Sequence, residues 1–296
     1  MAGLLVPRAH CTRVTELMVG EQIGSYRVIS HLVGNTYRVV QVGTQRRALL
    51  ELAPPDNWRE VSLQMLRAQQ LVESMQHPGI ARIIDRGMLA DRRPWIATEV
   101  PSGIGLYDLI ARRELPPLEL TALIRDIADV LAYAHSLGII HRALTLRSIV
   151  LATGTRTFPI AIADWGLRSG DIGVYAAPEL SLGRCDGRAD VYALGVIAFR
   201  AATRKFPGER GASDIPGIPD GLATLISRML VLDPNERPTA AEVRAFAAEL
   251  VTDDLAHPEG PRFAKPKWTP NPDFAITSER AQTATGEIDD APKKPS

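Results

Sequence analysis

Apolar residues recur with two different periods along the chain, and the period changes near residue 102. The first part contains short runs rich in Val, Leu and Tyr with glycines between them, which is typical of β-strands. The predicted strands are residues 26–32, 37–42, 47–52, 80–84 and 94–100. Residues 60–76 show helical spacing and end before Pro78, so one helix is predicted among these strands.

After Ser102 and Gly103 the spacing of the apolar residues becomes helical. The predicted helices are residues 106–113, 118–137, 189–203, 221–230 and 240–250. A small antiparallel sheet with one helix, followed by a larger helical part, predicts an α+β fold with two lobes. We expect the folded domain to cover residues 20–250, with an N-lobe at 20–101 and a C-lobe at 102–250.

The two ends of the chain differ in composition from this middle part. Residues 1–19 show no clear period, so we expect a disordered extension, ordered structure from about Gly20, and either Met1 or Met18 as the start. Residues 251–296 hold seven prolines, many charges and few aliphatic residues. Such a segment cannot bury enough apolar surface to order itself, so a largely disordered tail is predicted.

The tail also contains residues suited to binding a protein partner. Phe263, Trp268 and Phe274 lie among prolines, and aromatic residues in an extended segment favour a short docking motif. The alternative is that they pack back on the helical lobe. Thr283 and Thr285 lie near acidic residues, which suggests phosphorylation by a true kinase and binding to a phosphothreonine-binding domain; the alternative is that neither is modified.

Charge and cysteine content exclude several classes of protein. The formal net charge is zero with 23% charged residues, which argues against nucleic-acid partners and a polybasic membrane anchor. No apolar run approaches the roughly 18 residues that a membrane helix needs. Cys11 and Cys185 lie far apart without metal-ligand spacing, so we expect inert thiols and a cytoplasmic protein.

Five short motifs occur in an order that is specific as a set. They are His141-Arg142-Ala143, Asp164-Trp165-Gly166, Ala177-Pro178-Glu179, Asp190 and Arg237. Over residues 22–250 the chain thereby resembles the eukaryotic-type (Hanks-type) Ser/Thr protein kinases. Its local sequence is most similar to that of bacterial members. The resemblance implies the two-lobed kinase fold, with structural roles for His141, Asp190 and the Glu179–Arg237 ion pair.

The resemblance also assigns residues to a nucleotide cleft. These positions are Gly34, Val39, Ala48, Leu50, Glu51, Thr98, Glu99, Pro101 and Asp164. Leu50 or Glu51 occupies the place of the family's phosphate-binding Lys, because the first Lys of the chain is Lys205. The glycine-rich loop keeps one glycine, with Val33 and Tyr37 placed where phosphate would approach. Pro101 lacks the N–H that meets adenine in the family.

The positions for phosphoryl transfer depart furthest from the family pattern. Ala143 stands at the catalytic base, Ser148 at a metal-binding Asn, and Ala68 at the helix Glu that pairs with the Lys. Asp164 is the one candidate Mg²⁺ ligand, although a structural role is the alternative. The segment 167–176 is short and offers only Ser169 for phosphorylation.

These departures lead to the interpretation that the chain is a pseudokinase. We therefore expect no enzyme activity, no catalytic residues, no cofactor beyond weak ATP with Mg²⁺, and a regulatory or scaffold role in signalling through protein partners. The alternative is a weak or unconventional ATP-dependent Ser/Thr kinase, or another nucleotide transferase that uses the same cleft.

Overall fold

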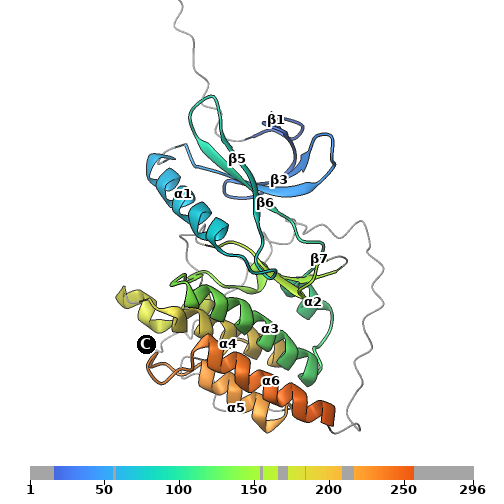
Figure 1. Cartoon of the computed structure of the whole chain (residues 1–296), viewed down its shortest axis with the longest axis vertical. Coiled ribbons are helices and arrows are strands. Elements are labelled where there is room, and N and C mark those ends of the chain that lie inside the picture. The colour runs from blue at the N-terminus through green and yellow to red at the C-terminus, as the bar shows by residue number, and fades with distance from the viewer. Residues whose placement is uncertain are drawn as a thin grey trace, which may run out of the picture. The chain divides into compact units, whose positions relative to one another are not determined.

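A computed structural model describes residues 17–55, 58–153, 156–165, 173–183, 185–208 and 217–256. The chain divides into two compact units (Figure 1). One unit comprises Met1–Leu63 and Ile84–Thr98, and the other comprises Gln64–Ile83 and Glu99–Ser296. Residues 64–83 thus group with the helical unit, and the lobe boundary at residue 101 stays a prediction.

The first unit is built on an antiparallel sheet with strand order β1-β2-β3-β4-β6-β5. The strands are β1 (Gln22–Ile23), β2 (Tyr26–Val33), β3 (Thr36–Gln41), β4 (Arg47–Leu52), β5 (Ile83–Met88) and β6 (Pro94–Glu99). β2 and β3 form a tight hairpin in which Val33 pairs with Thr36. Gly34 has a φ of 57°, which a residue without Cβ adopts easily, so the turn needs only two residues.

The core of this unit contains residues from five strands, β1, β2, β3, β4 and β6, and from the chain before them. Tyr37, Val39, Ala48 and Leu50 have no exposed surface. Leu17 is 5% exposed in the same cluster, and its N–H donates to the Tyr37 hydroxyl at 3.3 Å. The domain boundary predicted near Gly20 is therefore corrected to include Leu17.

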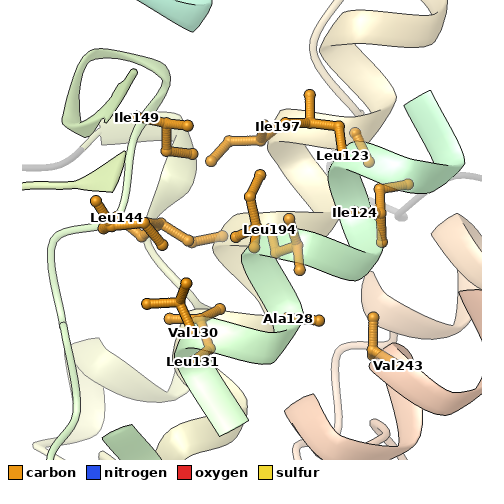
Figure 2. Close-up of a cluster of buried hydrophobic side chains, with 14 of the residues drawn as sticks. Leu123, Ile124, Ala128, Val130, Leu131, Leu144, Ile149, Leu194, Ile197 and Val243 are labelled. Carbon is orange, nitrogen blue, oxygen red and sulfur yellow. The ribbon is translucent and has the colours of Figure 1, made fainter. Parts of the chain in front are cut away.

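The second unit is mainly helical (Figure 1) and contains a larger hydrophobic core. Its helices are α2 (Leu106–Arg112), α3 (Pro117–Ser136), α4 (Gly187–Thr203), α5 (Asp220–Met229) and α6 (Ala240–Ala256), and α1 (Trp58–Ser74) begins in the first unit. The long helix α3 packs against both α4 and α6. Figure 2 shows Ile124, Ala128 and Leu131 of α3, Leu194 of α4 and Val243 of α6 in one buried cluster.

Local sequence explains where these helices begin and end. Pro117 opens α3, where its missing N–H costs nothing, and Gly138 follows its end with a φ of 73°. The Asp186 carboxylate accepts a 2.8 Å hydrogen bond from the N–H of Arg188 and so caps α4. Thr239 and Glu242 form a reciprocal capping box at the start of α6.

A second, three-stranded sheet lies in the helical unit with the order β7-β8-β9. Its strands are β7 (Gly103–Gly105), β8 (Ile149–Ala152) and β9 (Ile160–Ile162). Three short 3-10 turns complete the unit: η1 (Leu146–Ser148), η2 (Gly173–Tyr175) and η3 (Pro178–Leu182). The second sheet and these turns position the polar residues of the candidate active site.

Two predicted elements differ from the structure. The strand predicted at 80–84 instead spans Ile83–Met88, because Ile80 is buried in the core of the helical unit and makes a single bridge to Ile162. The helix predicted to end at residue 250 continues to Ala256, and Val251 is only 8% exposed. Cys11, Ser169 and the docking residues predicted in the tail lie outside the described residues.

Candidate active site

Asp190 of α4 binds the backbone of the His141-Arg142 segment. One carboxylate oxygen accepts the N–H of His141 and the other accepts the N–H of Arg142, both at 2.8 Å. The ring of His135 adds a third bond at 2.8 Å, and Asp190 is 1% exposed. Arg142 takes a φ of 66°, which is unfavourable for a side chain with a Cβ. The buried carboxylate holds the loop in that conformation.

His141 connects this loop to the segment that carries Asp164. Its Nε2–H donates to the carbonyl of Ala163 at 2.9 Å, while Nδ1 accepts the N–H of Ala143 at 3.3 Å. The imidazole also lies 4.7 Å from the ring of Trp165, measured between centroids. Asp164 lies between these two contacts, half-buried and with a φ of 66°. The position of Asp164 is thus constrained from both sides.

Ala143 and Ser148 lie on the same loop, and both are buried. Ala143 is 4% exposed and Ser148 is 1% exposed. The Ser148 hydroxyl donates to the carbonyl of Thr145 at 2.8 Å and accepts the N–H of Thr145 at 3.0 Å. These bonds close the η1 turn, so the hydroxyl at this position stabilises the loop.

Glu179 and Arg237 form a buried, bidentate ion pair. The two bonds measure 2.6 and 3.2 Å, and the Arg237 side chain has no exposed surface. Arg237 also donates to the backbone carbonyls of Arg188, Val231 and Leu232. With all its donor groups used, this side chain connects the η3 turn to the start of α4 and to the loop before α6.

The predicted hinge residues Glu99 and Pro101 lie in the helical unit. The Glu99 carboxylate accepts a bond from Arg156 at 2.8 Å and from the N–H of Arg82 at 3.0 Å. Arg156 also donates to the carbonyls of Pro78 and Ile80. Glu99 is therefore part of a network that joins the end of β6 to the segment after α1, and Pro101 next to it is buried.

The remaining nucleotide-cleft residues lie in the first unit. Val39 pairs with Ala48 across β3 and β4, and both side chains lie in the core together with Leu50. Because side chains alternate along a strand, half-buried Glu51 points to the other face of the sheet from Leu50. Thr98, at the end of β6, is half-buried, and Gly34 forms the exposed hairpin turn.

The position of the Tyr37 side chain differs from the prediction for the glycine-rich loop. The sequence suggested that its side chain lies where a phosphate would approach. Tyr37 is instead fully buried in the core of the first unit, where its hydroxyl bonds to Leu17. The hairpin therefore presents Gly34 without this aromatic ring beside it. Ala68, at the predicted helix-Glu position, is also buried, at 2% exposed.

Sequence analysis did not single out a cavity of about 300 Å³ beside the η1 turn. Its walls include Arg147, which lies in the loop between Ala143 and Ser148, and Arg200 of α4. One signal was available, because Arg147 is a charged residue between two residues, Leu146 and Ser148, of a loop that resembles the catalytic loop of the family. The residues that line the cavity together with Arg147 come from distant parts of the sequence, and no pattern in the sequence connects them.

The described residues contain neither a metal-binding cluster nor a membrane-spanning helix. No cluster of three or more His, Cys, Asp or Glu side chains that would hold a metal occurs among the residues placed in the structure. No helix within the described ranges is both long and apolar enough to cross a membrane. The pKa of the Cys185 thiol is raised by burial, so this thiol stays protonated at neutral pH.

Comparison with known proteins shows the family. The protein kinase domain matches residues 32–246, and the chain therefore belongs to the protein kinase family. The serine/threonine-protein kinase pkn2 of Myxococcus xanthus is 25% identical over 89% of this chain and 36% of its own length. PknJ of Mycobacterium tuberculosis is 26% identical over 79% of this chain and 46% of its own length.

PknI, another serine/threonine-protein kinase of Mycobacterium tuberculosis, is 31% identical over 66% of this chain and 34% of its own length. The chain thus spans between a third and a half of the length of each of these three relatives. The α+β two-lobed fold predicted from the motifs is confirmed by the family match and by the sheet and helical units.

The prediction that the chain is not an enzyme is wrong. The matched family is the protein kinase domain, and these relatives are named serine/threonine-protein kinases, which are enzymes. The residues at positions 143 and 148 show how this member differs from the family pattern. They do not by themselves mark a chain without activity.

Proposed function

We propose that this chain is an unconventional ATP-dependent Ser/Thr protein kinase. The observation that supports this function best is the fixed geometry of the catalytic loop. Asp190 binds the backbone at His141 and Arg142, and His141 binds the segment that carries Asp164. A buried network of this kind holds a loop in one conformation, and such positioning supplies much of the catalysis in phosphoryl transfer.

The reaction breaks the bond between the β–γ bridging oxygen and the γ-phosphorus of ATP and forms a bond from phosphorus to a Ser or Thr oxygen. In its loose transition state the acceptor hydroxyl has little need of early deprotonation. The proton therefore leaves to solvent or to the transferred phosphate when no base stands at position 143. Loss of a general base typically costs about 10²–10⁴-fold in rate, so slow turnover is expected.

Asp164 fits the metal requirement of this reaction. Mg²⁺ is usually held by one or two carboxylates together with the phosphates of the nucleotide, so a single carboxylate is sufficient for an ion that arrives with ATP. When bound, the ion would neutralise negative charge on the phosphates. The half-buried Asp164, constrained by its neighbours, is the side chain that would hold it.

Transfer of labelled γ-phosphate from ATP with Mg²⁺ to the protein itself and to a mixture of generic protein substrates tests the proposal. Asp164→Asn should abolish the signal, whereas Asp220→Asn, which changes an exposed Asp at the start of α5, should preserve it. A signal equal in both variants would come from a contaminating kinase. That result, or no transfer above the protein-free blank after hours, rejects the proposed function.

A further inference from the structure

The cavity beside the η1 turn is lined by three arginines and three aromatic residues. They are Arg147, Arg200, Arg204, Tyr107, Tyr175 and Phe206. They come from four separate segments: α2, η1, η2 and the end of α4 with the loop after it. Buried side chains of Leu146 and Ile110 add apolar surface to the same cavity. The walls therefore combine positive charge with apolar surface.

The guanidinium groups are held by aromatic rings. Arg147 lies 4.3 Å above the centroid of Tyr107, and Arg200 lies 4.8 Å above the centroid of Phe206. Stacking on a ring orients the planar guanidinium but leaves its N–H donors in the plane available for another group. Within the described ranges, both guanidinium groups thus have a ring contact that leaves their donors available.

Acidic partners for these arginines are scarce. In the described part of the chain neither Arg147 nor Arg200 has a carboxylate oxygen within 4.0 Å, and Arg204 has a long contact of 3.9 Å to the mostly exposed Glu114. Three positive charges around about 300 Å³ therefore lack close compensation among the described residues. Charge of this kind raises the local concentration of anions.

Tyr175 supplies a neutral donor group in the same cavity. Burial raises the pKa of its hydroxyl, although Arg200 and Arg147 partly oppose this change. The hydroxyl therefore keeps its proton at neutral pH. The ring of Tyr175 meets Phe206 edge to face, with centroids 5.9 Å apart, which connects the two sides of the cavity.

We propose that this cavity binds an anionic side chain, either a carboxylate or a phosphate, on an extended peptide segment of a protein substrate. Planar arginines bind both anions with paired hydrogen bonds, and the apolar surface accommodates the aliphatic part of the side chain. Arg147 directly precedes Ser148 on the catalytic loop, so the peptide would lie next to that loop. That the bound protein is a substrate rests on the proposed function, but binding of the peptide itself requires no phosphate transfer.

Selection from a degenerate peptide library, without nucleotide, tests the inference. The library carries a fixed central Ser and flanking positions that include Asp, Glu, phosphoserine, Lys and neutral residues. Immobilised full-length protein should enrich acidic residues or phosphoserine several-fold at one flanking position. Preference for phosphoserine over Asp identifies a phosphate as the ligand, and equal preference identifies any anion.

Matched variants decide whether the cavity is responsible. Arg147→Gln and Arg200→Gln should each reduce the enrichment at least about fivefold, whereas Arg228→Gln, which changes an exposed arginine on α5, should leave it unchanged. Thermal melts of each variant verify folding. Enrichment that is absent, or that persists in both cavity variants, overturns the inference.

Inorganic phosphate distinguishes a peptide site from a site for the free ion. If millimolar phosphate displaces the enriched peptides only partly, the peptide is the ligand. The peptides are present at the concentration that half-saturates their binding. If millimolar phosphate then displaces them completely, the peptide part of the inference fails. A protein that transfers phosphate but selects no acidic peptide rejects this inference alone, and the reverse result rejects only the proposed function.

Discussion

Two groups of arginines in the helical unit have opposite surroundings. Arg237 is completely buried, and its donors are used by Glu179 and by three backbone carbonyls. Arg147 is exposed and touches a ring, with no carboxylate near it in the described residues. A buried charge must recover its lost hydration through bonds within the protein, whereas an exposed one keeps its donors for a ligand. Arginine thus stabilises the fold at position 237, and at position 147 it is available to bind a ligand.

The largest expected effect is the loss of the buried pair. Arg237→Leu leaves the Glu179 carboxylate buried without a counter-charge, which should cost about 3–5 kcal/mol of unfolding free energy. Urea denaturation measures this change. Arg244→Gln, which breaks the solvent-exposed pair with Asp129, should cost less than about 1 kcal/mol. Similar losses in the two variants would contradict the distinction between buried and exposed arginines.

Asp190→Asn tests a second buried charge, a carboxylate whose two oxygens both accept hydrogen bonds. The amide replaces one acceptor oxygen with a donor that faces the N–H of a backbone group, so we expect a loss of about 1–3 kcal/mol. Because the loop then loses its fixed conformation, phosphate transfer should fall as well. Denaturation and transfer are measured on the same sample. Unchanged transfer with reduced stability would show that Asp190 holds the fold but not the geometry of the loop.

Glu242 provides an exposed charge that is nevertheless bonded. Hydrogen bonds from the backbone N–H and hydroxyl of Thr239 lower the pKa of its carboxyl group below the usual value. A lowered pKa in the folded state stabilises the protein above the ordinary pKa of Glu, and this contribution disappears as the pH falls through the lowered value.

Glu242→Gln should therefore reduce stability at pH 7 by about 0.3–1 kcal/mol, as expected for a carboxylate at a helix N-terminus. The difference between wild type and variant should vanish in acid. Denaturation at pH 7 and at pH 3 measures both values. A difference of the same size at both pH values would mean that the carboxylate charge is not the cause.

The smallest expected effect on stability belongs to the cavity arginines. Arg147→Gln removes a side chain that is exposed and that, among the described residues, contacts the ring of Tyr107, so unfolding free energy should stay within about 0.5 kcal/mol of wild type. Only peptide selection should change. A loss above about 2 kcal/mol would show that Arg147 is needed for the fold and would remove the contrast with Arg237.

The sequence predicted most helices and strands because their apolar residues repeat with a regular period. It failed at Ile80, where an apolar run that reads as a strand packs into the helical unit's core instead. It also missed Leu17, since one apolar residue before a strand has no period. Both residues are fixed by contacts with distant parts of the chain, which local spacing does not encode.

The sequence alone determined the family motifs, the order of the elements and the side chains present at positions 143, 148 and 164. Residue types in an ordered motif are visible without coordinates. Only the tertiary structure decided which side chains share a cavity, because Tyr107, Arg147, Tyr175 and Arg200 come from segments that meet through packing. The structure also decided which arginines are bonded, since hydrogen-bond partners depend on distance in space and not on distance along the chain.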